Sequence, residues 1–282
     1  MIAALLLAAS IAPLVHDGDL SPAQRVSASR ESATPQSTGQ VEAPDPYTKG
    51  DWLGTGALVG AAVGFGVWPD PKHCRWCDRD ATGADSLNAF DRSTRSAWIW
   101  SSGNQGKANV ISSITEFAPL VFLIPQGNRH FDDTAIPVLR AFAVSTLITD
   151  VLKVSVARER PDVHLGTIDA DQIGKGANKS FVSGHTSGAF SMVFALARVY
   201  ADRHDPHTRW VWIAGLPLAA YTGYLRIAAD KHYATDVLAG AALGGAVGWT
   251  VPGLMKHERS HAGALQPDLA AGAGTLALRW SW

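Results

Sequence analysis

Three short stretches in the second half of the chain concentrate residue types that can bind phosphate. The first is Lys153-Val-Ser-Val-Ala-Arg-Glu-Arg160-Pro161. Because seven residues at about 100° each return almost to the starting direction, Lys153 and Arg160 can share one helix face. Pro161 disfavours helical geometry at Arg160, so this guanidinium is predicted where the helix gives way to a loop. An ammonium and a forked guanidinium together suit a tetrahedral oxyanion, although basic residues at a helix end also simply complement the helix dipole.

The second stretch is Ser180-Phe-Val-Ser183-Gly184-His185-Thr-Ser-Gly, and it runs directly into an apolar segment. Ser183 has the residue type of a helix N-cap, and the free N–H groups at a helix start bind anions. Gly184 leaves room for a ligand oxygen close to its backbone, and His185 could donate a proton to a leaving group. An ordinary serine cap beside a partly exposed histidine is the alternative interpretation.

The third stretch runs from Arg226 through His232 to Asp236. His232 and Asp236 are four residues apart, so on a helix the carboxylate could accept the imidazole N–H and leave the other nitrogen free for attack. Arg226 would point about 120° away on a continuous helix, so we expect a break, with Asp230 or Lys231 opening the next helix. Such a His/Asp pair is also a common structural contact, and without a His-Glu-x-x-His motif a metal site is disfavoured.

Six mostly apolar segments are long enough for helices and are separated by polar or proline-containing loops, with no run of alternating strands among them. The sequence therefore predicts an all-α six-helix bundle. The segments are 52–68, 109–124, 136–157, 183–201, 210–225 and 234–255.

Composition favours a bundle embedded in a membrane. Hydrophobic residues make up 46% of the chain and charged residues 17%, against roughly 25% charged in ordinary soluble domains. Segments 210–225 and 234–255 approach the roughly 20 apolar residues that a spanning helix needs. Two segments carry charges that would have to face a functional interior, namely Glu116 and the set Arg140, Asp150 and Lys153.

Glycine recurs every fourth residue in two of the segments, which places these glycines on one helix face. The runs are Gly56, Gly60 and Gly64 in the first segment and Gly240, Gly244 and Gly248 in the last. This spacing lets a neighbouring backbone approach closely, as membrane helices often do, and tight packing in a soluble bundle is the alternative.

The 282 residues divide by composition into four parts. Residues 1–16 are predicted to be a signal peptide or an apolar N-terminal segment, and residues 17–48 a disordered linker. The helical domain spans 49–258, and 259–282 form a tail. A net charge of −1 leaves no basic excess for nucleic-acid binding.

Cys74 and Cys77 are the only cysteines in the sequence. In an exported protein they favour a small-loop disulfide over a redox or zinc site, since zinc would require two further ligands.

The three stretches, in this order and with these spacings, resemble the type 2 phosphatidic acid phosphatase (PAP2) superfamily, which also includes bacterial class A acid phosphatases and vanadium haloperoxidases. The resemblance covers roughly residues 109–250. Two positions differ from the family's frequent pattern: Val182 stands where a proline often precedes Ser-Gly-His, and Leu225 stands where a serine often precedes the third-stretch arginine.

The resemblance implies a role for each residue of the three stretches. His232 would be the nucleophile that accepts the phosphoryl group, Asp236 would orient it, and His185 would protonate the leaving oxygen and then activate water. Neither a metal nor a cofactor is implied, because cationic side chains would bind the equatorial oxygens. The implied phosphate-binding groups are Lys153, Arg160, Ser183, the Gly184 backbone N–H and Arg226.

We therefore expect a metal-independent phosphatase that acts through a phosphohistidine on phosphomonoesters, above all on lipid phosphates such as phosphatidic acid or a polyprenyl phosphate. Its expected place is a bacterial-type inner membrane with the active site facing the periplasm, or else the periplasm as a soluble protein. The alternatives are a vanadate-dependent haloperoxidase and a non-catalytic membrane protein that binds lipid headgroups.

Overall fold

The computed structural model describes residues 47–67, 69–167, 176–264, 268–272 and 275–279, and the described chain is mostly helical. The elements in chain order are α1 (Lys49–Gly66), α2 (Ala89–Trp98), α3 (Ser102–Phe117), the 3₁₀ helix η1 (Ala118–Gln126), α4 (Gly127–Val156), α5 (Pro161–His164), α6 (Gly184–Asp202), α7 (Thr208–Trp210), the π-helical η3 (Val211–Gly215), α8 (Leu216–Ala228), α9 (Ala234–Ala264), β1 (Asp268–Gly272) and β2 (Thr275–Arg279).

The helical architecture predicted from the apolar segments is confirmed. The described residues of each segment are mostly helical, although 109–124 is divided between α3 and η1, and 210–225 among α7, η3 and α8. Two shorter helices, α2 and α5, lie in polar sequence that shows no apolar run. The two strands pair as an antiparallel hairpin with Asp268 opposite Arg279.

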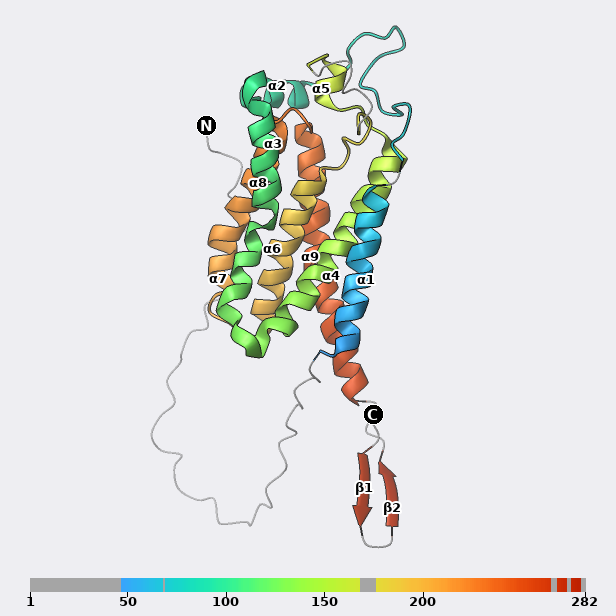
Figure 1. The fold of residues 1–282 in the computed structure, drawn as a ribbon, viewed down its shortest axis with the longest axis vertical. Helices are drawn as coiled ribbons and strands as arrows, with labels where there is room; N and C mark the ends of the chain where they lie inside the picture. The colour runs from blue at the N-terminus through green and yellow to red at the C-terminus, as the bar shows by residue number, and fades with distance from the viewer. Residues whose placement is uncertain (1–46, 68, 168–175, 265–267, 273–274, 280–282) are drawn as a thin grey trace, which may run out of the picture. The chain divides into compact units, whose positions relative to one another are not determined.

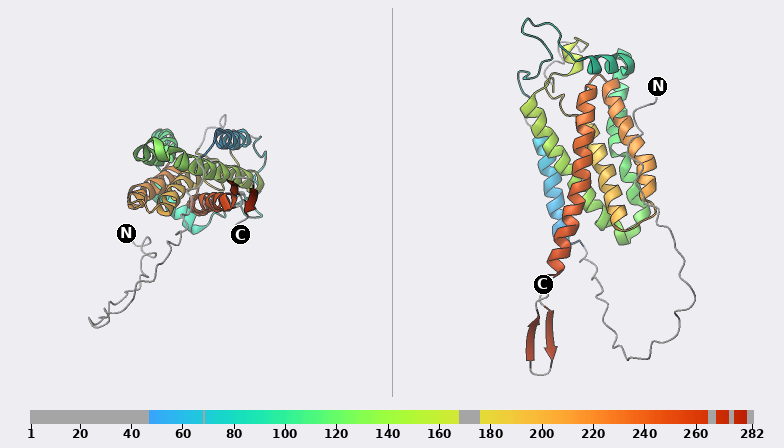
Figure 2. Two further views of the ribbon diagram at one scale, coloured as in Figure 1. Left: turned by 90° about the horizontal axis from the view of Figure 1, so that it is seen from below. Right: turned by 180° about the vertical axis from the view of Figure 1, so that it is seen from behind.

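Helix α6 forms the centre of the bundle and packs against α9, α4, α8 and α3 (Figure 1), while α1 packs on α4 (Figure 2). Small and apolar side chains are buried along nearly the whole of α6, as expected for a helix that neighbours cover on several sides. The main apolar core therefore lies around α6, and its fully buried members include Ala189, Val193 and Leu196. Because α6 begins directly after Ser183, this core fixes the position of the second sequence stretch.

The glycine run of α9 is a close helix–helix contact with α6. A Cβ atom added at Gly240 would lie 2.6 Å from the carbonyl oxygen of Ser183, and Gly244 and Gly248 face the Ser187 and Ser191 carbonyls in the same way. The run in α1 behaves differently, because a Cβ atom at Gly56, Gly60 or Gly64 would meet no described atom within 4 Å. The predicted close approach is confirmed for α9, whereas the described neighbours of α1 leave its glycines open.

The described part of the chain contains three helical stretches that are long and apolar enough to cross a membrane: Ser102–Ile124, His130–Val156 and Ala234–Arg259. Two basic residues of the stretch His130–Val156 form ion pairs. Arg140 on α4 contacts Asp51 on α1 at 3.2 Å, and Lys153 lies 3.3 Å from Asp150 one turn away. The bundle is thus a membrane-type helical fold with ion pairs both within a helix and between helices.

The predicted signal segment and almost all of the predicted linker lie outside the described residues. Thr48, at the end of that linker, caps α1 through a reciprocal pair of hydrogen bonds with Asp51. At the other end of the domain, α9 continues past residue 258 to Ala264.

Candidate active site

The first stretch ends α4 and then turns sharply towards the site. Lys153 lies in the last turn of α4, which ends at Val156, and Ala157 adopts a left-handed backbone conformation with a φ of 49°. Arg160 is extended, with a ψ of 153°, and caps the short helix α5, in which Pro161 is the first residue. The predicted loop position of Arg160 is confirmed, and the left-handed turn at Ala157 is the local reason for it.

The second stretch forms the start of α6. Ser183 is the N-cap residue as predicted, and its hydroxyl lies 2.8 Å from that of Thr186. A Cβ atom at Gly184 would lie 2.7 Å from the Lys153 ammonium nitrogen, so glycine lets this cation approach the N-terminus of α6. The imidazole Nε2 of His185, in the first turn, lies 3.1 Å from the Ser113 hydroxyl and 3.8 Å from the Glu116 carboxylate.

The third stretch contains the predicted break between Arg226 and His232, but the next helix starts later than expected. Arg226 lies in the last turn of α8, and α9 begins at Ala234 rather than at Asp230 or Lys231. Asp230 adopts a left-handed conformation with a φ of 58°, and Arg95 holds its carboxylate through two hydrogen bonds of 2.6 Å. His232 is therefore a loop residue rather than a residue of the helix.

The predicted hydrogen bond between His232 and Asp236 is absent. The imidazole Nδ1 is 3.9 Å from the nearer carboxylate oxygen of Asp236, and instead its N–H donates to the Ser180 carbonyl oxygen at 2.7 Å. The cause is the later start of α9, which places His232 outside the helical i, i+4 geometry. Asp236 instead accepts from the backbone N–H of Tyr233 at 3.0 Å and from the Ser180 hydroxyl at 2.6 Å.

The contact with Ser180 fixes the protonation pattern of the His232 ring. A carbonyl oxygen can only accept, so Nδ1 carries the proton and the neutral ring keeps its lone pair on Nε2. Burial and the nearby charges of Arg226, Arg160 and Lys153 hold the pKa of His232 well below its ordinary value. The ring is therefore a neutral base with a free nitrogen at neutral pH.

The three stretches converge on this ring. The groups whose charge acts on His232 are Arg226 from α8, Arg160 from the loop after α4, Lys153 from α4 and His185 from α6. The buried Nε atoms of Arg160 and Arg226 have no hydrogen-bond partner among the described residues. Since buried donors are normally satisfied, two unpaired guanidinium N–H groups beside one imidazole suit an oxyanion ligand.

Helix α3 supplies contacts to Arg226 that the three stretches did not indicate. One guanidinium nitrogen of Arg226 donates to the Asn109 side-chain oxygen at 2.7 Å and to the Ser112 hydroxyl at 2.8 Å. Asn109, Ser112, Ser113 and Glu116 follow one another at helical spacing on one face of an otherwise apolar segment. That polar stripe is the signal in the sequence that could have revealed them.

Cys74 and Cys77 form the predicted disulfide, with a Cα–Cα separation of 5.4 Å. Within the described ranges, no group of three or more His, Cys, Asp or Glu side chains is arranged to hold a metal ion.

Comparison with known proteins places the chain in a family. The model of the PAP2 superfamily matches residues 134–259, which include all three stretches. Lipid A 4'-phosphatase of Porphyromonas gingivalis is 30% identical over 182 residues, which are 62% of this chain and 68% of that protein. The chain belongs to the PAP2 superfamily. The resemblance seen in the three sequence stretches is thereby confirmed.

Further PAP2 relatives match shorter regions. Lipid A 1-phosphatase of Porphyromonas gingivalis is 38% identical over 96 residues, covering 34% of this chain but only 18% of that protein. Phosphatidylglycerophosphatase B of Bacillus subtilis is 29% identical over 136 residues, or 45% of this chain and 61% of the relative. The chain thus spans less than two thirds of both proteins.

A solved structure of a transmembrane PAP2 type phosphatidylglycerolphosphate phosphatase from Bacillus subtilis superposes with a TM-score of 0.47 at 19% sequence identity. The superposition covers 74% of this chain and 96% of that one.

Proposed function

We propose that the protein is a membrane-embedded phosphatase that removes the phosphate from a phosphorylated lipid through a phosphohistidine at His232. One observation carries the proposal: a buried, neutral imidazole with its Nδ1–H bound to Ser180 lies among the cations Lys153, Arg160 and Arg226. The same cluster suits a phosphoryl group in two ways, because it offers a nucleophile to the phosphorus and positive charge to the equatorial oxygens.

In the first step the Nε2 lone pair of His232 attacks phosphorus, and the bond to the ester oxygen breaks. Burial and the nearby cations lower the pKa of His185 to about 3, so its ring takes up a proton only when the phosphate dianion of the substrate binds beside it. His185 then gives this proton to the leaving alkoxide, which departs as the alcohol. In the second step the now neutral His185 takes a proton from water, and the resulting hydroxide attacks phosphorus. The N–P bond then breaks, its electron pair returns to Nε2, and inorganic phosphate leaves with both histidines in their starting states.

The three cations lower the barrier because they are already in place when charge gathers on the equatorial oxygens. The backbone N–H of Gly184, at the start of α6, adds a fixed hydrogen-bond donor to the same oxygens. Asp236 contributes indirectly in this scheme: it binds the Ser180 hydroxyl, and the Ser180 carbonyl binds the nucleophile.

The lipid class of the substrate is supported by the membrane-type helices and by the relatives, whose names specify lipid A and phosphatidylglycerophosphate as their substrates. These substrates are phosphomonoesters attached to lipids. The natural substrate of this chain is accordingly a lipid phosphomonoester.

The disulfide supports a site that faces the periplasm. Cys74 and Cys77 enclose a loop whose backbone pairs with the strand that follows α4: the N–H of Arg75 donates to the Ala157 carbonyl, and the N–H of Glu159 to the Trp76 carbonyl, each at 3.0 Å. The loop and the phosphate-binding cluster are therefore on the same side of the membrane. Disulfides persist in oxidising compartments, which supports a periplasmic location for that side.

Phosphate release by the protein in detergent micelles tests the proposal. The substrates are phosphatidic acid, phosphatidylglycerophosphate, lipid A and a soluble aryl phosphate. Wild-type protein is expected to release phosphate from at least one lipid, and His232→Ala to release none. The matched control is His207→Ala, because His207 is exposed and contacts Asp205 rather than the cluster. Wild-type turnover in His232→Ala contradicts the assigned role.

A further inference from the structure

Arg158 is a fully buried cation held by carboxylates from three segments that are distant in sequence. Its guanidinium donates to Asp78 and Asp91, each at 2.9 Å, and to Asp236 at 2.7 Å. The Thr235 hydroxyl accepts a further hydrogen bond at 2.7 Å. Arg158 therefore joins the disulfide loop, the start of α2 and the start of α9 at one point.

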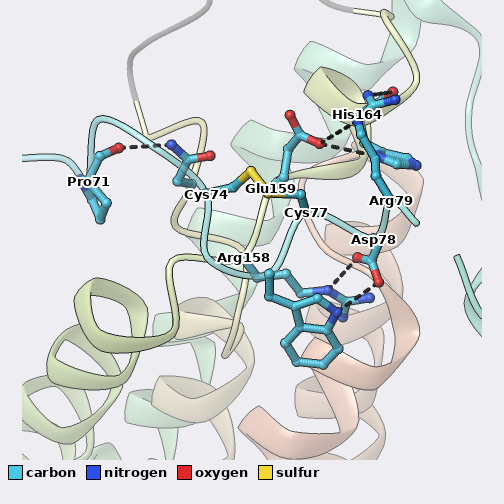
Figure 3. The surroundings of a disulfide bond; sticks show 10 residues. Pro71, Cys74, Cys77, Asp78, Arg79, Arg158, Glu159 and His164 are labelled. Carbon is cyan, nitrogen blue, oxygen red and sulfur yellow. Dashed lines mark hydrogen bonds and ion pairs between the residues drawn. A yellow bond between two sulfur atoms is a disulfide. The ribbon is translucent and has the colours of Figure 1, made fainter. Parts of the chain in front are cut away.

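Two aromatic rings cover the faces of this guanidinium. Trp76 lies 4.1 Å and Tyr233 4.0 Å from its central carbon, which is close cation–π geometry. Trp76 is one of the two residues enclosed by the disulfide, and Figure 3 shows Asp78, directly after that ring, directed at Arg158. The ring Cys74–Cys77 thus holds one face of the Arg158 site.

Arg158 positions Ser180 from two directions. The Ser180 N–H donates to the Arg158 carbonyl oxygen at 3.0 Å, and the Ser180 hydroxyl donates to Asp236, which the Arg158 side chain holds. The Ser180 carbonyl in turn accepts the Nδ1–H of His232 at 2.7 Å. An unbroken set of hydrogen bonds thus connects the buried guanidinium to the imidazole.

A purely structural reason for this network is weak, because a buried ion cluster contributes less to stability than well-packed apolar residues of the same volume. Burying three carboxylates and one guanidinium carries a large desolvation penalty. We propose that Arg158 is a positioning residue that sets the ring orientation and tautomer of His232, and that Trp76, enclosed by the disulfide, holds Arg158 in place. The inference rests on the proposed function only for its effect on kcat.

Arg158→Lys keeps the charge, but an ammonium cannot make the hydrogen bonds of a guanidinium bound to three carboxylates. The loss of these bonds can prevent folding, so this variant is a poor test. A milder pair of variants lies within the disulfide ring. Trp76→Leu removes the ring over the guanidinium. Arg75→Ala removes its exposed neighbour, whose side chain donates to the Ser155 carbonyl at 2.7 Å. Both variants leave every residue of the phosphate-binding cluster unchanged.

Steady-state kinetics with the aryl phosphate is the first measurement, made per folded molecule after size-exclusion chromatography. Trp76→Leu is expected to lower kcat roughly 10-fold with KM within about twofold, since a misplacement of about 1 Å can cost on the order of 10²-fold. Arg75→Ala is expected to match the wild type. A purely structural role would reduce the amount of folded protein and leave kcat per folded molecule unchanged.

The second measurement is the ¹⁵N spectrum of protein labelled at histidine, in which the Nδ1–H signal of His232 is assigned by its loss in His232→Gln. Trp76→Leu is expected to shift or broaden this signal, and Arg75→Ala to leave it in place. Equal effects of the two variants on kcat, or a His232 signal unchanged in Trp76→Leu, would overturn the inference. A wild type without phosphatase activity would refute the proposed function instead, and the spectra alone would then decide the role of Arg158.

Discussion

Gly240→Ala perturbs the contact that joins the second and third stretches. The added Cβ would lie 2.6 Å from the Ser183 carbonyl oxygen, about 0.8 Å short of the 3.4 Å at which ordinary contact begins. Both atoms are tied to backbone, so neither can rotate away as a flexible side chain would. The start of α6 and the first turns of α9 must therefore move apart by a similar distance.

The magnitude has a stability part and an activity part. Overpacking of this kind costs about 1–3 kcal/mol, and replacing glycine by alanine within a helix returns up to about 1 kcal/mol. At about 2–4 °C per kcal/mol, the Tm should fall by a few degrees. The activity should fall further, by roughly 10-fold to 10²-fold, because Ser183 precedes Gly184 and His185 and a shift near 1 Å misplaces them relative to His232.

The assay combines thermal unfolding in detergent, followed by tryptophan fluorescence, with phosphate release from the aryl phosphate. The matched control is Gly60→Ala in α1, the same substitution at a position where the added Cβ meets no described atom within 4 Å. It should leave both Tm and activity at wild-type values or slightly above. A Gly240→Ala variant as active and stable as wild type, or a Gly60→Ala variant that is equally damaged, would refute the packing argument.

Two further predictions concern the ring of His232 and the helix α3. Because burial holds the pKa of His232 well below its ordinary 6.5, the unfolded chain takes up a proton below about pH 6.5 that the folded chain does not, so stability falls as the pH drops from there. Tm measured between pH 7.5 and 5 should therefore drop more in wild type than in His232→Gln, and parallel curves would contradict the buried neutral ring. Ser112→Ala removes a hydrogen bond to the Arg226 guanidinium and should raise KM and weaken inhibition by vanadate roughly 10-fold, whereas Ser113→Ala, whose hydroxyl contacts His185, should lower kcat instead. Identical kinetic changes in the two variants would contradict the assignment of Ser112 to phosphate binding and of Ser113 to proton transfer.

The sequence was sufficient to predict the helices and the backbone geometry of two of the three stretches, because these depend on local patterns. Apolar runs predicted the six helices of the bundle, and Pro161 predicted the extended backbone at Arg160. The break after Arg226 followed from helical geometry alone. In each of these cases neighbouring residues in the chain determine the outcome.

The partner of His232 could not be predicted in the same way. An i, i+4 pair with Asp236 is the local expectation, but the hydrogen bond goes to Ser180, which is 52 residues away in the chain. The left-handed turn at Asp230 delays the start of α9, and that turn is held by Arg95 on α2. A distant contact thus decides which oxygen accepts the imidazole proton.

The two glycine runs illustrate the same limit. Both have the same four-residue spacing, but only the run that begins at Gly240 faces a backbone among the described residues, that of α6. Arg158 is a further case, since a single arginine two residues before Arg160 carries no sign in the sequence of the three carboxylates that surround it.

The phosphohistidine can be tested most directly by trapping it. Wild-type protein is mixed with a ³²P-labelled lipid phosphomonoester, quenched with denaturant at alkaline pH within one turnover, digested and analysed by mass spectrometry. The expected result is an acid-labile, alkali-stable label on the peptide that contains His232, and no label in His232→Ala. A label on another side chain, or no label on the His232 peptide of wild-type protein quenched within its first turnover, would contradict attack by His232.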